Sequence, residues 1–407
     1  MRKLIQIGAG NIGRSFIGER FASSGFEVVF VDVDATLIDE INRACQYQVV
    51  IKHNENSDTS IWVRGIRGIH GADVDHITEE IAGADYVATS VGLAALPRVA
   101  PVVASGIRAR AERGGAPLDI ILAENIRDAS TLFRREIDAC LKNDEPEVVE
   151  FASRSVGLVE TSIGKMVPIM TASDREIDPL WVFAEAYNTL IVDSKAFRGP
   201  LPPIDTLKPV ESIRAYVDRK LFIHNLGHAC VAYHGFVAHP ERQYLYEVLA
   251  DEEIADAARE TMRESAAGLH ASYPNELDLD ALYENIDDLL YRFRNRSLED
   301  TVYRVGRDLM RKLGHDDRLI GPAIMAARHS LSIDRISKTI AAAILFRATD
   351  ESGKLFDNDS EFARRYENDV DRILSEVAEL STEDPVELRV REAVGEAFRH
   401  LVSPGEE

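Results

Sequence analysis

Cysteine is scarce in this chain. The 407 residues include only three cysteines, Cys45, Cys140 and Cys230, which lie far apart in the sequence. A disulfide framework and a cysteine-rich zinc site both need several cysteines at close, regular spacings. We therefore expect the thiols to be reduced, without a disulfide scaffold and without a zinc cluster.

Long apolar runs are also missing. No run of about 18 apolar residues exists, which is the length that a membrane-spanning helix needs. The first residues, MRKLIQ, enter a strand-like segment at once and do not resemble a signal peptide. We therefore expect a cytoplasmic protein that does not enter a membrane.

Positive charge is the third shortage. There are 47 Lys and Arg against 69 Asp and Glu, which gives a formal net charge of -22. Such a surface repels nucleic acid and anionic membranes, so neither is an expected partner. An anionic substrate would need a local basic pocket.

The length and the hydrophobic fraction of 45% suit a globular protein with two domains, each with its own core.

A glycine-rich turn follows the first apolar run, residues 4–7. An amphipathic segment comes directly after the turn, and strand, glycine turn and helix together form the context of a dinucleotide-binding fingerprint. Gly8 permits the tight turn, Gly10 lets the backbone approach a pyrophosphate, and Gly13 lets helix and strand pack closely. The helix N-terminus would receive the anion. The expected dinucleotide-binding residues of this turn are Gly8, Gly10, Asn11, Ile12 and Gly13.

Asp32 ends the second expected strand, residues 27–31. It follows Gly13 by about 20 residues, the spacing at which a carboxylate accepts hydrogen bonds from the adenosine ribose. Because a carboxylate there would repel a 2′-phosphate, the sequence favours NAD over NADP. The alternative is that Asp32 and Asp34 only begin a turn and cap the helix at residues 35–44.

Further strands and helices alternate through the first half of the chain. This order predicts a parallel sheet with right-handed crossovers, whose ligands bind at the carboxyl ends of the strands. Asn125 follows one such strand, although a helix N-cap or a turn would also explain it. The expected segments are a strand with its loop at 85–92, a helix at 93–113, a strand at 118–122 and a β-rich segment at 147–168 that completes the sheet.

The second half has helical apolar spacing almost throughout. We expect a Rossmann-type domain over residues 1–195, and an all-helical domain over residues 196–407 after the break at GPLPP. The first long helix carries Lys220, His224, Asn225 and His228, which a 3.6-residue turn places within one arc.

An ammonium, an amide and an imidazole that converge in this way could move a proton and stabilise an oxyanion. The alternative is an ordinary helix with a solvated lysine and structural histidines. His224 and His228 are one turn apart, but the sequence lacks the Glu of an HExxH motif, and no third residue stands at a spacing typical of a metal ligand. We therefore expect no metal.

The densest basic cluster comprises Arg304, Arg307, Arg311, Lys312 and Arg318. The three arginines from 304 to 311 share one face if a single helix continues through them. Guanidinium forks suit a phosphate or a carboxylate, so we expect this cluster to hold an anionic part of the substrate. The alternative is that these cations form salt bridges with acidic neighbours.

Several motifs together resemble the polyol-specific long-chain dehydrogenase/reductase family, and within it the enzymes that act on mannitol 1-phosphate. The motifs, in chain order, are GAGNIGRSFIG, ILAEN, VDRKLFIHNLGHA, RVGR, RKL, DRLI and IAAAILFR. The resemblance runs nearly end to end. It implies a Rossmann-type domain followed by a helical substrate domain, no zinc, and the NAD-linked interconversion of mannitol 1-phosphate and fructose 6-phosphate.

The resemblance also implies roles for particular residues. The catalytic lysine of the family falls on Lys220, its two oxyanion-binding asparagines fall on Asn125 and Asn225, and its supporting histidine falls on His228. Lys220 would give a proton to the carbonyl oxygen during reduction. To act as a base near neutrality it needs a pKa roughly three units below the usual value. The expected partner is a small sugar phosphate or polyol, and the expected assembly is a monomer or a small homo-oligomer.

Two departures from the family pattern affect the substrate assignment. Gly164-Lys165 stands where Asp-Arg is usual, and Asp308-Leu309 follows RVGR where a proline is common. Both lie where we expect the substrate to be gripped. The alternatives are a mannitol 2-dehydrogenase or a hexuronate reductase of the same family, or a protein that senses NAD without catalysis.

Overall fold

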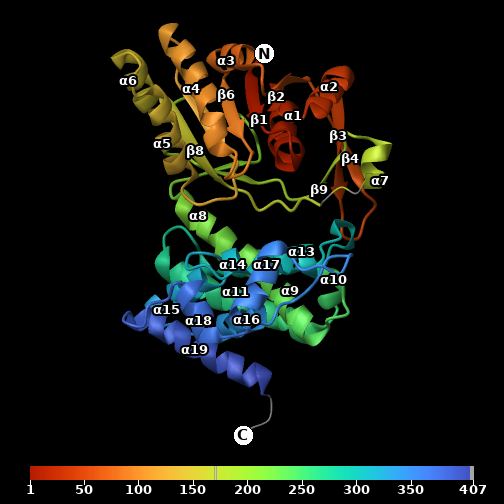
Figure 1. Cartoon of the computed structure of the whole chain (residues 1–407). Coiled ribbons are helices and arrows are strands. Elements are labelled where there is room, and N and C mark those ends of the chain that lie inside the picture. The colour runs from red at the N-terminus through yellow and green to blue at the C-terminus, as the bar shows by residue number, and fades with distance from the viewer. Residues whose placement is uncertain (169, 171, 404–407) are drawn as a thin grey trace. The chain divides into compact units, whose positions relative to one another are not determined.

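The chain divides into two compact units, Met1–Ile213 and Arg214–Glu407. The computed structural model in Figure 1 describes residues 1–168, 170 and 172–403. The division falls later than the expected boundary at 195. The reason is that β10 (Leu190–Asp193) and β11 (Leu207–Val210) still belong to the large sheet of unit 1.

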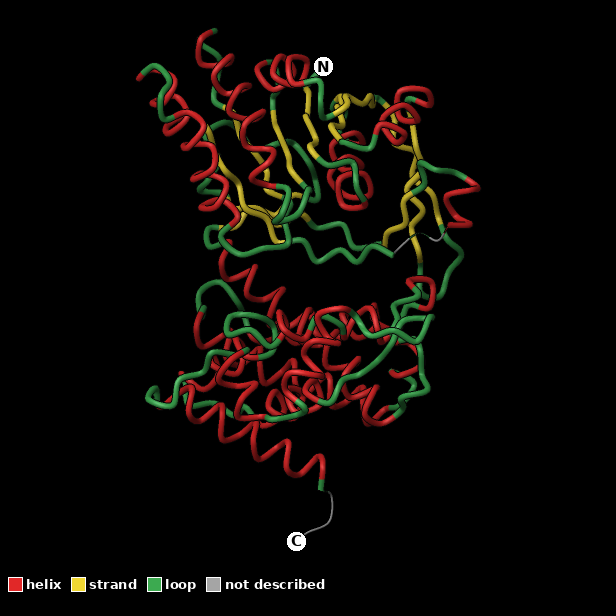
Figure 2. The backbone as a smooth tube through the Cα atoms, viewed as in Figure 1, coloured by secondary structure: helices red, strands yellow, loops and turns green. Residues whose placement is uncertain are grey.

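The large sheet of unit 1 has eight strands in the order β11-β10-β8-β7-β6-β1-β2-β5. Neighbours from β8 through β5 are all parallel, which confirms the predicted parallel sheet. The exception lies at one edge, where β10 runs antiparallel to β8. The strands of unit 1 are yellow in Figure 2. The bounds are β1 (Lys3–Ile7), β2 (Glu27–Asp32), β5 (Ile66–His70), β6 (Tyr86–Thr89), β7 (Leu118–Leu122) and β8 (Val156–Ser162).

Helices cover this sheet because their apolar faces need burial. One core cluster joins side chains of the sheet to Ile81 of α3, Ile107 of α4 and Phe133 of α5. Each fully buried side chain of this size stabilises the fold by roughly 1.5–3 kcal/mol relative to exposure. The helices are α2 (Ala35–Ala44), α3 (Val74–Ala82), α4 (Leu96–Glu112), α5 (Ala129–Leu141) and α6 (Pro146–Ser155).

The expectation of a β-rich segment at 147–168 was partly wrong. Residues 146–155 form α6, and the strand begins only at Val156. Pro146 occupies the first turn, and Val148 and Ala152 are buried four residues apart on one face. For residues 146–155, the helical spacing of the apolar positions therefore indicated the secondary structure better than the content of β-branched residues did.

A second, smaller sheet of three strands also belongs to unit 1. Its order is β4-β3-β9, with β3 antiparallel to β4 and parallel to β9. Tyr47 of β3 is fully buried and its hydroxyl donates to the Arg14 carbonyl, which ties this sheet to the helix after the glycine turn. The bounds are β3 (Gln46–Lys52), β4 (Thr59–Arg64) and β9 (Val182–Glu185).

Unit 2 is helical, and its described residues include no strand, only one isolated bridge between Tyr244 and Thr301. Its first long helix combines α8, a π-helical segment η2 and α9, and α9 contacts α10, α11, α13 and α16. No helix among the described residues is long and apolar enough to cross a membrane.

The helices of unit 2 span the following residues: α8 (Ile213–Arg219), η2 (Lys220–Asn225), α9 (Leu226–Ala238), α10 (Leu245–Val248), α11 (Glu252–Ser272), α12 (Leu279–Phe293), α13 (Val302–Gly306), α14 (Leu309–Lys312), α15 (Ile320–Arg328), α16 (Asp334–Ile344), α17 (Asp357–Tyr366), α18 (Val370–Glu376) and α19 (Pro385–Val402).

Candidate active site

The glycine turn of unit 1 has the shape that a dinucleotide requires. Gly8 has a φ of +93°, and a Cβ on it would lie 2.6 Å from the Ser90 carbonyl oxygen. A Cβ on Gly13 would overlap the Gly8 carbonyl oxygen, whereas a Cβ on Gly10 would meet nothing within 4 Å. The first and third glycines are therefore needed for the turn itself. The open space above Gly10 is where a pyrophosphate would approach.

Asp32 lies beside this turn, at the carboxyl end of β2. Its Oδ2 accepts a hydrogen bond of 2.7 Å from the Ala9 N–H, and its Oδ1 accepts one of 3.1 Å from the Asp34 N–H. The cap of α2 is Asp34, whose Oδ1 accepts from the Leu37 N–H. Capping therefore explains Asp34 and not Asp32. The neighbouring Val33 is 82% exposed.

Asn125 lies just beyond the carboxyl end of β7 and is exposed. The N-cap of α5 is Asp128, so the N-cap interpretation of Asn125 was wrong. The preceding Glu124 is buried and accepts hydrogen bonds from the Val91 N–H at 3.0 Å and the Gly92 N–H at 2.8 Å. Glu124 thus ties the loops after β6 and β7 together. The sequence analysis missed it, although an acidic residue directly after a buried strand was a usable signal.

The helix that carries Lys220 in unit 2 is not a regular α-helix at that point. Lys220–Asn225 forms a π segment, in which hydrogen bonds reach back five residues instead of four. In a regular helix, Lys220 and Asn225 would be roughly 140° apart around the axis. The π turn absorbs one residue, so Asn225 and His228 follow Lys220 as positions i+4 and i+7 would in an α-helix. The expected 3.6-residue register was therefore wrong at this point, because the helix is π-helical from Lys220 to Asn225.

Lys220 is a functional candidate with a strongly lowered pKa. Its side chain is partly buried, and burial is the largest cause that lowers its pKa to about 7. The positive charges of Arg318 and Arg311 lower the pKa further, and Asp317 opposes them. A solvated surface lysine would not show this shift. Near neutral pH the amine can therefore either accept or donate a proton.

Two buried polar side chains accompany Lys220 on the same helix. Asn225 is 8% exposed, and its side-chain amide makes no hydrogen bond with another of the described residues. Burial, followed by the charge of Arg292, lowers the pKa of His224 well below its ordinary value. His224 is therefore neutral at pH 7. A buried amide without a protein partner is suited to bind a substrate oxygen.

His228 is held by two contacts. Its Nε2 lies 3.1 Å from Oδ2 of Asp300, and its ring stacks on Phe293 with centroids 4.6 Å apart and planes at 15°. Asp300 is buried and also pairs with Arg304. Asp300 and Phe293 were not predicted from the sequence, although Asp300 lies only four residues before Arg304, with which it pairs.

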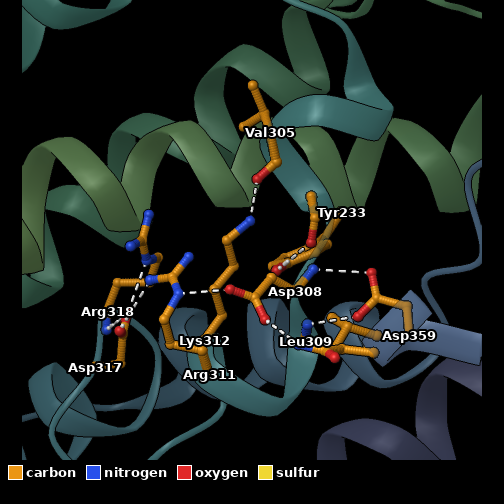
Figure 3. A network of polar contacts seen from close by, with 11 residues as sticks. Tyr233, Val305, Asp308, Leu309, Arg311, Lys312, Asp317, Arg318 and Asp359 are labelled. Atoms are coloured by element: carbon orange, nitrogen blue, oxygen red, sulfur yellow. Dashed lines mark hydrogen bonds and ion pairs between the residues drawn. The ribbon is translucent and has the colours of Figure 1, made fainter. Parts of the chain in front are cut away.

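The basic cluster does not lie on one helical face. The helix α13 ends before Arg307, Asp308 has a φ of +74°, and α14 then begins at Leu309. Figure 3 shows the cause: Asp359 accepts hydrogen bonds of 2.8 and 2.7 Å from the backbone N–H groups of Asp308 and Leu309. The expectation of a continuous helix through Arg304, Arg307 and Arg311 was therefore wrong.

Most members of the cluster are neutralised within unit 2. Arg311 bonds Asp308 at 2.6 Å and Asp317 at 3.2 Å, and Arg318 bonds Asp317 at 2.8 Å (Figure 3). Lys312 is buried, donates to the Val305 carbonyl, and has a pKa well below its ordinary value because of burial. The salt-bridge interpretation thus applies to Arg304, Arg311 and Arg318.

Arg307 differs from the rest of the cluster. Its guanidinium lies 5.5 Å from the ring centroid of Tyr303 and 5.2 Å from that of Phe356. Within the part of the chain that the structure describes, no carboxylate pairs with it. Two aromatic rings therefore hold a positive charge whose hydrogen-bond donors are not used by an acidic partner.

No group of three or more His, Cys, Asp or Glu among residues 1–168, 170 and 172–403 could hold a metal ion. His224 and His228 lie with their ring centroids 6.1 Å apart, and both pack against Phe293. These histidines are therefore organised by aromatic contacts and by Asp300.

Comparisons with known proteins match both units. The family model described as the mannitol dehydrogenase Rossmann domain matches residues 2–206, and the one described as the mannitol dehydrogenase C-terminal domain matches residues 212–396. A crystal structure of D-sorbitol dehydrogenase in substrate-free form has a TM-score of 0.78 at 15% identity, covering 99% of this chain and 93% of that one. Mannitol 2-dehydrogenase of Pseudomonas fluorescens, in a ternary complex with NAD and D-mannitol, has a TM-score of 0.74 at 15% identity, covering 99% and 92%. At this identity the two structures show a shared fold.

The position of Asp32 leads to a prediction about the dinucleotide. The wild type should bind NADH far more tightly than NADPH. The double variant Asp32→Ser, Val33→Arg should narrow this difference in affinity by about ten- to a hundredfold. The reason is that hydrogen bonds of Asp32 to the ribose are lost and those of the new arginine to the 2′-phosphate are gained, and each charge-assisted bond contributes roughly 1.5–3 kcal/mol. Fluorescence titration with both nucleotides measures this. Asp34→Ser is the matched control, since it removes only a helix cap, at a cost of roughly 1 kcal/mol. Equal affinity of the wild type for NADH and NADPH would contradict the prediction.

Proposed function

The chain belongs to the mannitol dehydrogenase family, and from this we propose that it is a mannitol-1-phosphate 5-dehydrogenase, which interconverts mannitol 1-phosphate and fructose 6-phosphate with NAD. The observation that carries the proposal is the π segment of unit 2. There, an amine with a pKa of about 7 is followed on the same helix by a buried amide and an anchored imidazole. Charges of the basic cluster act on the same amine.

NAD is the cofactor, as in the family's Rossmann domain, and the residues of unit 1 fit it. The open space above Gly10 would accept the pyrophosphate, and Asp32, which lies beside the turn, would accept hydrogen bonds from the ribose hydroxyls. Bound NAD supplies the hydride acceptor for polyol oxidation, and its reduced form supplies the hydride for ketone reduction. The remaining chemistry is a proton transfer and the stabilisation of charge on one oxygen.

Lys220 carries the proton. In the direction of reduction, its ammonium donates a proton to the carbonyl oxygen of the ketose, and in oxidation its neutral amine takes the hydroxyl proton. Asn225 donates a hydrogen bond to this oxygen as negative charge develops on it. For Asn125 of unit 1 we propose the second oxyanion-binding role that the family resemblance implies. His228, fixed by Asp300 and Phe293, supports this group.

The pKa of Lys220 predicts opposite pH dependences for the two directions. Polyol oxidation needs the neutral amine, so kcat should rise as the pH rises through about 7 and then level off. Ketose reduction needs the ammonium, so its kcat should fall over the same interval. Lys220→Ala should lower kcat by roughly 10² to 10⁴-fold and remove both slopes, while NADH binding is unchanged.

Lys338→Ala, at an exposed lysine of α16, is the matched control and should retain both pH profiles. Steady-state rates in both directions between pH 5 and pH 9, the range about two units either side of the expected pKa, measure the effect. A Lys220→Ala enzyme with a near-normal kcat would remove this residue from the mechanism.

We assign the phosphate to Arg307, because no carboxylate among the described residues uses its donors. Arg307→Gln should raise KM for fructose 6-phosphate by about ten- to a hundredfold, which corresponds to one charge-assisted contact of roughly 1.5–3 kcal/mol. KM for NADH and turnover of unphosphorylated fructose should change little. Arg311→Gln is the matched control: Asp308 and Asp317 already hold this side chain, so KM should change less and thermal stability more.

A second candidate function is that of a mannitol 2-dehydrogenase. It is favoured by the three ion-paired arginines, because a pocket whose cations are already neutralised suits an uncharged polyol. Rates of NADH oxidation with fructose 6-phosphate, fructose and a ketouronate, measured side by side, separate the candidates. Preference for fructose would select the second candidate, and preference for the ketouronate would select a hexuronate reductase.

A further inference from the structure

A buried serine of another helix contacts the π segment. Ser265 of α11 is 1% exposed, and its hydroxyl donates a hydrogen bond of 2.7 Å to the carbonyl oxygen of Phe222. Phe222 lies in the middle of Lys220–Asn225 and is itself 2% exposed. The contact is therefore made in the protein interior, where a hydroxyl without a partner would cost roughly 1–3 kcal/mol.

Close packing at the end of the π segment brings this serine into reach. A Cβ on Gly227 would overlap the sulfur of Met262, so α9 and α11 are in direct contact there. Met262 and Ser265 are three residues apart on α11 and therefore lie on the same face of that helix. Because Gly227 has no side chain, Met262 can pack directly against it. Ser265, one turn further along α11, then faces the helical turn at Phe222, which precedes Gly227.

The π turn decides which side chains accompany Lys220. If the segment relaxed to a regular α-helix, each residue after it would rotate by roughly 100° relative to Lys220. Asn225 and His228 would then leave the stripe that they share with the amine. A π turn is rare and short, and it commonly occurs where side chains insert into the helical hydrogen-bond ladder or where function requires it.

We propose that Ser265 is a positioning residue, whose hydrogen bond to the Phe222 carbonyl holds the π turn in register and keeps Lys220, Asn225 and His228 on one stripe. The roles of these three residues rest on the proposed function. The placement of the turn itself does not, because it depends only on contacts within unit 2.

Ser265→Ala tests the proposal. We expect kcat to fall at least tenfold, KM for NADH to stay unchanged, and the pH at which kcat is half-maximal to move upward as Lys220 becomes more solvated. The charged or titratable groups that act on Lys220 include Arg318, Asp317, Arg311 and His224, and the substitution alters none of these four directly. A shifted pH profile would therefore report a moved lysine.

Thr261→Val is the matched control on the same helix. Thr261 is also 1% exposed, and its hydroxyl bonds the Ala257 carbonyl at 2.8 Å and contacts Cys230 of α9 without touching the π segment. It should lower thermal stability about as much as Ser265→Ala and leave kcat and the pH profile unchanged. Ser265→Cys, which keeps the volume and a weak donor, should fall between the wild type and Ser265→Ala.

Two readouts without turnover separate this inference from the proposed function. Hydrogen exchange of the amides in residues 220–226 should accelerate in Ser265→Ala and not in Thr261→Val, and the pH dependence of amine labelling at Lys220 should shift. If the wild type oxidises no polyol, the proposed function fails while these readouts still decide the role of Ser265. Unchanged exchange and labelling in Ser265→Ala, or equal effects of Ser265→Ala and Thr261→Val, would overturn the inference.

Discussion

The loss of solvent around one ammonium group is the constraint on which unit 2 depends. A charged amine loses hydration energy when protein surrounds it, and the pKa of Lys220 falls to about 7 as a result. The neighbouring arginines strengthen the effect, but their own charges need acidic partners. Asp308 and Asp317 are these partners: both pair with Arg311, and Asp317 also pairs with Arg318. The pKa of Lys220 therefore depends on the same charges that pair within the basic cluster.

Local sequence order was enough to predict much of unit 1. The glycine turn follows β1 and Asp32 ends β2, as the order of strand, turn and helix in the sequence predicted. The two lie close together because a parallel sheet brings the carboxyl ends of neighbouring strands to one edge. At α6 the prediction was wrong, since β-branched residues also fit a helix whose buried positions recur every four residues. Composition was a weaker guide than periodicity there.

The candidate site in unit 2 shows where sequence reasoning stops. The residue types and their order on one helix were predictable, but a 3.6-residue period cannot reveal a π turn, because that turn depends on packing against α11. The break between α13 and α14 likewise depends on Asp359, about fifty positions further along the chain. Both features are set by tertiary contacts and leave no local pattern.

The π turn also has a consequence at the level of the gene. A π turn is an α-helix that accommodates one extra residue, so removing one codon between Lys220 and Asn225 would restore an ordinary helix. In the shortened helix the asparagine and the histidine would follow the lysine by four and seven positions, which is the spacing of one face of an α-helix. An ancestral helix without the extra residue could thus have carried the same three side chains on one face, and a single insertion could have been accepted there without dispersing them.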